Sequence, residues 1–483
     1  MDAEQLQQLK PMLHDYLKQF DDCFFREGTR GHLPVYVEGQ LSDLSEKTLA
    51  PIAARAGVPP RTLQEFLSLL RWDQDRMRDH LERIVAAQHA GPHAIGIFDE
   101  TSDAKKGDKT PGVKRQWCGA LGKQDNCIVT VHLAYARGDF HCLLDGELFL
   151  PEDWAADRER CREAGIPDTM QYRPKWQIAL ELYDQAIANG IRFAWVTFDE
   201  GYGGKPAFLQ ALNARKQPFA GEIPKSLTGW IGPPKVTKRP YRRKRGRGRT
   251  KPRLVAGSRK ARSVSWLLTH HPALRDQAWK TYRVKDGEKG PMLWEVKASR
   301  FYPKLGRLPM PRHRLVIARN VLKPEEIKVF LGRAWSAVPL DDLLLAGFSR
   351  WHVERCLQDS KQEVGLDHYE GRRYLGLKRH LAISAVSYLF LAQVQSTWSE
   401  KKGSGAYDRT GADGFGRTDP ALVAEGTHFE ETPRFDPRAH RRPATRRRQG
   451  PSQPDQANTP KTAGNRHPAH KNPPLPVGYK LET

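Results

Sequence analysis

Cysteine is scarce in this sequence, and its spacing matches no metal-binding module. Six cysteines occur among 483 residues, and no two of them form a C-x2-C pair. Zinc modules and disulfide-stapled folds both depend on closely spaced cysteines. The sequence therefore predicts neither, and it is typical of a cytoplasmic protein.

Long apolar runs are also missing. No run approaches the roughly 20 apolar residues of a transmembrane helix. The opening residues Met1–Glu4 lack the basic and apolar character of a signal peptide. We therefore expect no membrane partner.

Acidic residues are outnumbered by basic ones. There are 56 Asp and Glu against 79 Lys and Arg, a formal net charge of +23, which favours a polyanionic partner such as nucleic acid. The segment Lys235–Arg262 holds 14 Lys or Arg among 28 residues and no acid. It suits contact with DNA phosphates, or it is a disordered basic loop without fixed contacts. Its densest run is Arg242, Arg243, Lys244 and Arg245.

Residues 1–90 are predicted to form a helical domain, because their apolar residues recur every three or four positions. Within this domain Leu49–Leu63 has the cadence of a helix-turn-helix. The small Ala53 lets two helices approach each other, and Gly57 makes the turn. Two interpretations stay open: a DNA-binding motif, or an ordinary helical hairpin that never touches DNA.

Residues 91–225 change to strand patterns. Apolar runs at 93–98 and 193–198 are typical of buried strands, and a helix over Pro174–Asn189, closed by Gly190, precedes the second run. Three strands, a helix, another strand and another helix make the mixed α/β sheet of a ribonuclease-H-like fold. Further strands are expected at 116–120 and 128–135, joined by a turn at 122–126, and at 140–149.

Residues 226–340 are expected to be a basic, β-rich insertion into this fold. A hairpin is predicted at 278–297 and a further strand at 313–318.

Residues 341–400 return to helical patterns and complete the ribonuclease-H-like core. One helix is predicted over 341–361 and another over 376–398. Residues 401–483 are low in aliphatic side chains and rich in proline, so we expect a disordered basic tail.

Two of the apolar runs lead into the same tripeptide, Phe-Asp-Glu, at Asp99 and at Asp199. An acid at the end of a buried strand is fixed by the sheet while its carboxylate faces solvent. Two such carboxylates on adjacent strands come close together, and they repel each other unless a cation neutralises their negative charge. Oxygen ligands favour Mg²⁺ or Mn²⁺. The alternative is that each acid only caps a turn or the following helix.

A charged set lies on the helix predicted after the insertion. Arg350, Glu354 and Lys361 are spaced by four and seven residues, so they share one helix face. A solvated ladder of salt bridges explains such a set as well.

With these residues the sequence resembles the DDE transposases of bacterial insertion sequences. More narrowly, it resembles the cut-and-paste group with a Tyr-x2-Arg-x3-Glu-x6-Lys signature and a β-rich insertion before the Glu. Arg350, Glu354 and Lys361 match the last three elements, whereas Gly347 stands where the Tyr is expected. The resemblance covers roughly residues 20–400.

The resemblance implies that Asp99, Asp199 and Glu354 are the catalytic residues and bind two Mg²⁺ ions, for which Mn²⁺ can substitute. Water would first free a 3′-OH at a transposon end, and this 3′-OH would then attack target DNA. The implied partner is double-stranded DNA, bound by a homodimer because paired ends need paired active sites. The implied location is the bacterial cytoplasm, at the nucleoid when the protein is on DNA.

The resemblance also assigns the neighbours of Glu354. Arg350 and Lys361 would hold DNA phosphates. Asp359 and Glu363 lie on the same predicted helix and are rivals for the third metal ligand. Glu354 is preferred because it alone keeps both spacings.

Other interpretations remain beside the transposase. A nuclease on the same scaffold would hydrolyse DNA without joining strands, and a catalytically silent derivative would only bind DNA. The three carboxylates argue against the silent derivative, and the insertion argues against a simple nuclease. The resemblance also implies that a Trp in the insertion stacks on a flipped base, for which Trp266 and Trp294 are candidates; the alternative is that both are core residues.

Overall fold

The structure is a computed structural model that describes residues 3–238, 251–287, 290–334 and 337–403. All of these residues belong to one compact unit, Met1–Val423. The basic run Arg242–Arg245 and the predicted tail beyond residue 403 lie outside the described residues.

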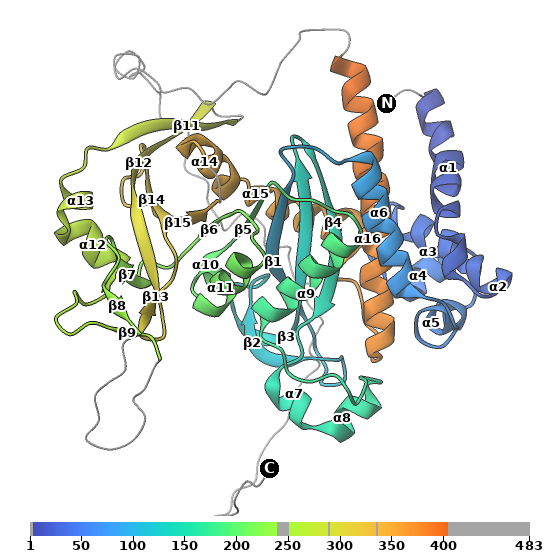
Figure 1. Cartoon of the computed structure of the whole chain (residues 1–483). Coiled ribbons are helices and arrows are strands. Elements are labelled where there is room, and N and C mark those ends of the chain that lie inside the picture. The colour runs from blue at the N-terminus through green and yellow to red at the C-terminus, as the bar shows by residue number, and fades with distance from the viewer. Residues whose placement is uncertain (1–2, 239–250, 288–289, 335–336, 404–483) are drawn as a thin grey trace, which may run out of the picture. The chain divides into compact units, whose positions relative to one another are not determined.

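Helices fill the described part of the first 90 residues, as the apolar spacing predicts (Figure 1). α4 and α5 pack against each other around Gly57, whose φ of +68° lies in the left-handed region that glycine tolerates. Ala53 and Leu63 are buried in the core. α4 and α5 therefore form a helical hairpin, and its identity as a DNA-binding helix-turn-helix stays a prediction. The elements are α1 (Ala3–Lys18), η1 (Asp21–Cys23), α2 (Glu27–Arg30), α3 (His32–Gln40), α4 (Leu49–Arg55), α5 (Pro60–Ser68) and α6 (Gln74–Gln88).

The central sheet has the strand order β4-β3-β1-β5-β6. β4, β3 and β1 are antiparallel neighbours, whereas β1, β5 and β6 run parallel. This mixed sheet confirms the predicted ribonuclease-H-like fold. β2 pairs antiparallel with the first part of β3. The strands are β1 (Ile95–Ala104), β2 (Lys114–Cys118), β3 (Lys123–Arg137), β4 (Phe140–Leu148), β5 (Trp195–Phe198) and β6 (Phe219–Glu222).

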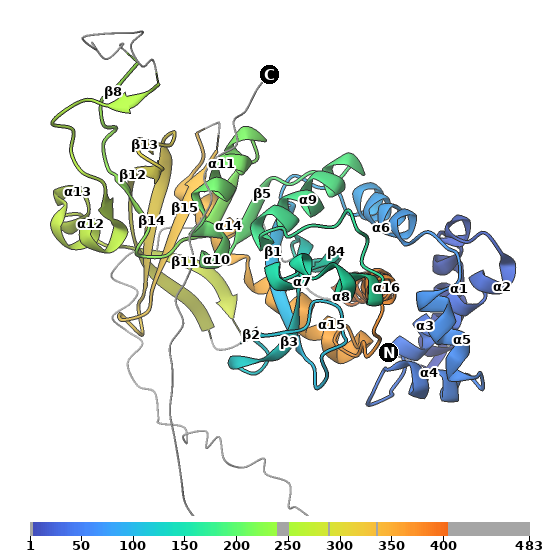
Figure 2. The same ribbon diagram turned by 90° about the horizontal axis from the view of Figure 1, so that it is seen from below.

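Helices cover both faces of this sheet (Figure 2). α9 packs on β3 and β4 and ends before Gly190, which has a φ of +96°. The helices of this region, α9 included, lie in the connections between strands. They are α7 (Glu152–Ala156), α8 (Arg158–Glu163), α9 (Lys175–Ala188), α10 (Glu200–Gly203) and α11 (Pro206–Ala214).

The predicted β-rich insertion continues the central sheet. β15 pairs antiparallel with β6, and β14 and β12 follow in order. The predicted hairpin corresponds to β11 and β12, and the predicted strand to β14. The elements are β7 (Thr228–Trp230), β8 (Val236–Thr237), β9 (Arg253–Leu254), β10 (Arg262–Ser263), α12 (Val264–His270), α13 (Pro272–Arg275), β11 (Lys280–Gly287), β12 (Gly290–Leu305), β13 (Leu308–Pro309), β14 (His313–Asn320) and β15 (Ile327–Arg333).

The single helix predicted over 341–361 is wrong, because the structure has α14 (Leu340–Phe348) and α15 (Trp351–Val364) there. The Ser349 hydroxyl donates to the carbonyl oxygen of Leu345 at 2.6 Å, a local bond of the kind that competes with helix continuation. α16 (Tyr374–Gly403) follows and packs on β4. Neither α16 nor any other helix in the described ranges is long and apolar enough to cross a membrane.

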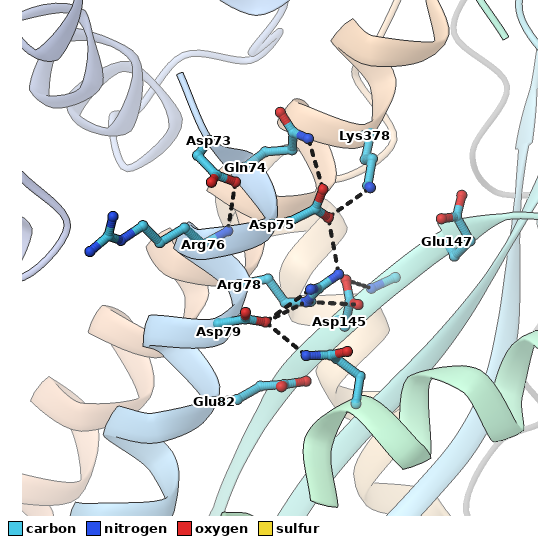
Figure 3. A network of polar contacts seen from close by, with 12 residues as sticks. Asp73, Gln74, Asp75, Arg76, Arg78, Asp79, Glu82, Asp145, Glu147 and Lys378 are labelled. Atoms are coloured by element: carbon cyan, nitrogen blue, oxygen red, sulfur yellow. Dashed lines mark hydrogen bonds and ion pairs between the residues drawn. The ribbon is translucent and has the colours of Figure 1, made fainter. Parts of the chain in front are cut away.

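A polar network connects the N-terminal helices to the central sheet (Figure 3). Arg78 on α6 pairs with Asp75 and Asp79 and reaches Asp145 on β4. Lys378 on α16 binds Asp75 at 2.7 Å. The helical region is therefore held to the ribonuclease-H-like core by charged groups as well as by apolar packing.

Candidate active site

Two parallel strands bring the predicted aspartates to the same part of the sheet. Phe98 on β1 pairs with Phe198 on β5. Asp99 and Asp199 are the residues that directly follow this pair. The prediction that β1 ends at this point is wrong. β1 continues to Ala104, because its pairing with β3 extends that far. Asp99 therefore lies within a strand, whereas Asp199 follows the end of its strand.

Asp199 is the N-cap residue of α10. Its Oδ1 accepts hydrogen bonds from the backbone N–H groups of Gly201 at 2.9 Å and Tyr202 at 3.2 Å. The capping role weighed for these acids is thus real for Asp199. Both bonds use one oxygen, and the side chain also lines an open pocket, so capping and ligand binding are compatible.

Arg350 links Asp99 to Glu354. Its Nη1 donates to Oδ2 of Asp99 at 3.1 Å, and its Nη2 donates to Oε1 of Glu354 one helical turn further along α15. Arg350 precedes the first residue of α15, so the break between α14 and α15 positions its guanidinium at the sheet. The acid on β1 and the acid on α15 therefore share one cation.

The electrostatics at Asp99 favour bound positive charge. Burial raises the pKa of Asp99 to about 7, and Arg350 and the backbone N–H of Glu100 oppose that rise, whereas Asp199 adds to it. Only 14% of the Asp99 side chain is exposed. A carboxyl group in this position needs a nearby cation to ionise fully at neutral pH.

The three predicted carboxylates do not form a closed metal cluster in this conformation. Within the described ranges, the group of ligand atoms that lie within 4.8 Å of one another is Asp22, Cys23 and His80. The Arg350 guanidinium stands between Asp99 and Glu354 instead. It gives one positive charge to both acids, and the pKa of Asp99 stays raised to about 7 beside it.

The rivals of Glu354 have other surroundings. Oδ2 of Asp359 accepts a hydrogen bond from Nε of Arg355 at 2.9 Å, and the two side chains form an ion pair. The side chain of Glu363 is exposed, and its carbonyl oxygen accepts from Nζ of Lys47. Glu354 is the acid of this helix that shares a partner with Asp99.

The other predicted residues on and before α15 are also placed. Lys361 lies beside β1, with its Nζ 3.4 Å from the carbonyl oxygen of Ser102. Gly347 is buried on α14, and a Cβ there would lie 2.9 Å from the Phe330 ring. The position of the signature's Tyr is therefore closed by packing. The DNA-contacting set Arg242, Arg243, Lys244 and Arg245 lies outside the described residues.

The two tryptophans considered for base stacking differ. Trp294 is buried and packs against Phe348 with ring centroids 5.0 Å apart, so it is a core residue. Trp266 on α12 is 37% exposed and stacks on His270, with the Arg262 guanidinium over its ring.

Comparison with known proteins places the chain in a family. Residues 19–291, more than half of the chain, match the family described as DDE superfamily endonuclease. The match includes Asp99 and Asp199 and ends before Glu354. Over 168 residues the chain is 38% identical to the probable transposase for insertion sequence element IS701 of Microchaete diplosiphon. That stretch is 34% of this chain and 41% of the relative, so less than half of the relative's length is covered. The chain belongs to the DDE superfamily endonucleases, enzymes that generally use divalent metal ions.

Proposed function

We propose that this chain is a DNA transposase that cuts the ends of a mobile element and joins the freed 3′-OH ends to target DNA. The catalytic residues in this proposal are Asp99, Asp199 and Glu354. The observation that carries it is the guanidinium of Arg350, which ties Asp99 on β1 to Glu354 on α15 beside the parallel strand that leads into Asp199.

The chemistry of this donor set is suitable for Mg²⁺, with Mn²⁺ as a substitute. Carboxylate oxygens are the ligands that these ions prefer. Asp99 is largely buried and close enough to Asp199 for their charges to interact, so added positive charge stabilises the ionised pair. Asp99, Asp199 and Glu354 would hold two such ions. Bound there, divalent metal lowers the pKa of water and neutralises charge on phosphoryl oxygens.

Arg350 and Lys361 would position the DNA. Release of Arg350 from Asp99 frees a planar guanidinium for bidentate contact with a phosphate. Lys361, beside β1 at Ser102, adds a second positive charge on the same side of α15.

The reaction has two displacements at phosphorus. In the first, the oxygen of water bonds to the phosphorus at an element end, and the P–O3′ bond breaks to leave a 3′-OH and a 5′-phosphate. In the second, that 3′ oxygen bonds to a phosphorus of the target strand and displaces the target's own 3′ oxygen. Each step makes one P–O bond and breaks one.

The partner in this proposal is double-stranded DNA, at both the element ends and the target. The net charge of +23 supports binding to a polyanion, and Arg242, Arg243, Lys244 and Arg245 would contact phosphates. A homodimer would supply one active site to each end, in the cytoplasm and at the nucleoid.

A plasmid that carries the gene with its flanking DNA tests this proposal. The purified chain is incubated with this plasmid, a target plasmid and Mg²⁺, and the products are sequenced, with Asp199→Asn as the control. We expect 3′-OH ends at inverted repeats and new junctions bracketed by a short target duplication, both lost in the control. Ends that are cut but never joined would contradict transposition and favour the nuclease. Absence of cutting would contradict both.

A further inference from the structure

A pocket of about 450 Å³ opens beside Asp199, between the start of α9 and α10. Its volume lies in the range of about 300–1,000 Å³ that holds small-molecule ligands. Four of its lining residues are aromatic, and two lysines and two acids also line it. The lining residues used below are Glu100, Phe149, Tyr172, Lys175, Trp176 and Tyr202, with Asp199 and Lys205.

This pocket lies on the other face of β1 from Arg350. Successive side chains of a strand point to opposite faces. Asp99 accordingly contacts Arg350 on α15, whereas Glu100 binds Nζ of Lys175 on α9 at 2.6 Å. Asp199 lines the pocket and also interacts electrostatically with Asp99. A strand held at Asp99 and Asp199 is therefore next to the pocket mouth.

The walls are suited to a flat ring. Phe149 and Tyr172 meet edge to face at 6.2 Å, and Trp176 adds a partly buried ring at the start of α9. Nζ of Lys175 lies 5.3 Å above the Phe149 ring. Tyr172 is 42% exposed, so part of this residue is accessible from solvent.

Tyr202, one of the lining residues, has a buried polar group without a partner in the described part of the chain. Tyr202 is only 3% exposed, and its hydroxyl has no hydrogen-bond partner among the described residues. A buried hydroxyl without a partner is costly. A ligand that carries polar atoms on the edge of a flat ring would satisfy it.

We propose that this pocket receives one unstacked nucleobase of the DNA strand held at Asp99 and Asp199. Its faces would pack against Tyr172 and Trp176, its polar edge would meet the Tyr202 hydroxyl, and Lys205 at the rim would bind a neighbouring phosphate. Aromatic side chains bind bases of any sequence by stacking. The assignment rests on the proposed function in one respect, that the ligand is DNA.

Photo-cross-linking tests the assignment directly. The probe is a short single-stranded oligodeoxythymidylate in which one thymidine is replaced by 5-iododeoxyuridine. It is mixed with the full-length chain and irradiated. Mass spectrometry then identifies the cross-linked residue. We expect the cross-link at Tyr172, Trp176 or Phe149. Tyr172→Ala should lower the yield about tenfold, as the loss of one stacking partner does, and Tyr172→Phe should restore it. Trp117→Ala is the matched control, because Trp117 is a 62% exposed ring on β2.

The outcomes separate this inference from the proposed function. Cross-links that map outside the pocket, to Trp266 for example, or an undiminished yield in Tyr172→Ala, would overturn the pocket assignment. The mapping in the wild-type chain gives this answer even if a variant fails to fold. If the chain cross-links in the pocket but cuts no DNA, the pocket stands and the proposed function falls. If the chain cuts and joins DNA but cross-links elsewhere, the proposed function stands and the pocket assignment falls.

Discussion

Arg350 donates a hydrogen bond from Nη1 to Oδ2 of Asp99 at 3.1 Å, across 251 positions of the chain. The same guanidinium holds Glu354. A metal ion that enters between these carboxylates must displace it, and the displaced guanidinium is then free to bind a phosphate. The proposed roles of Asp99 and Arg350 therefore exclude each other in this conformation and become compatible when metal and DNA bind together.

Removal of this arginine should strengthen metal binding and weaken catalysis. Without DNA, Arg350→Ala is expected to bind Mn²⁺ about tenfold more tightly, since one competing charge-assisted hydrogen bond amounts to about 1.5 kcal/mol. It should nevertheless cut DNA more slowly, because a phosphate contact is lost. Calorimetric titration with Mn²⁺ and a cleavage assay measure the two effects.

Arg355→Ala is the control for this pair of measurements. Arg355 lies on the same helix but pairs with Asp359, so Mn²⁺ affinity should not change. Equal or weaker Mn²⁺ binding by Arg350→Ala would contradict competition between guanidinium and metal.

A tyrosine at position 347, where the resemblance places one, should destabilise the fold. Gly347 is buried, and even a Cβ there would lie 2.9 Å from the Phe330 ring. Overpacking of a core costs about 1–3 kcal/mol or more, so Gly347→Tyr should lower the free energy of unfolding by at least that amount. Denaturant unfolding measures it.

Leu345→Tyr on the same helix serves as the comparison, because Leu345 is 40% exposed. Its unfolding free energy should change by less than about 1 kcal/mol. Equal stability of the two tyrosine variants would show that α14 has room for the signature residue.

The network of Figure 3 predicts a pH-dependent stability. Burial raises the pKa of Glu82 to about 8, with a further rise from Asp145, and burial raises the pKa of Asp145 to about 7. A group whose pKa is raised in the folded state contributes stability below its unfolded pKa and loses it as pH rises through the folded pKa. The free energy of unfolding should therefore fall between about pH 5 and pH 8.

Glu82→Gln should flatten that profile. The Glu82 carboxylate accepts from Nδ2 of Asn189 at 2.6 Å and is fully buried, so the neutral amide avoids the cost of a buried charge. We expect a gain on the order of 2 kcal/mol at about pH 8 and little change at about pH 5. Thermal unfolding across pH measures it, with exposed Glu46→Gln as the control. If the free energy of unfolding of Glu82→Gln falls with pH as steeply as that of the wild type, Glu82 does not cause the pH dependence.

The sequence predicts those features that depend on local pattern. The apolar runs before Asp99 and Asp199 indicate their strands, and the spacing of Ala53 and Gly57 indicates the turn between two helices. The break between α14 and α15 was missed; the Ser349 hydroxyl bonds to the Leu345 carbonyl at this point. Apolar periodicity does not report such a bond.

Contacts between segments that are distant in the sequence could not be predicted from local patterns. The pairing of β15 with β6 joins residues about a hundred positions apart, and no local pattern specifies it. The aromatic pocket was missed for the same reason: Phe149, Tyr172 and Tyr202 belong to three segments. The competition between Arg350 and a metal ion also needs the folded geometry, since the spacing of Arg350 and Glu354 alone suggests a surface salt bridge.

The most direct test of the catalytic assignment compares the three proposed catalytic acids with two other acids of α15. Cleavage of plasmid DNA that carries the gene's flanking sequences is measured in Mg²⁺ for the wild type, Asp99→Asn, Asp199→Asn, Glu354→Gln, Asp359→Asn and Glu363→Gln, with DNA binding followed in parallel. We predict that the first three substitutions abolish cleavage and leave DNA binding nearly intact, whereas the last two cut like the wild type. Normal cleavage by Glu354→Gln together with loss in Glu363→Gln or Asp359→Asn would contradict the assignment of Asp99, Asp199 and Glu354.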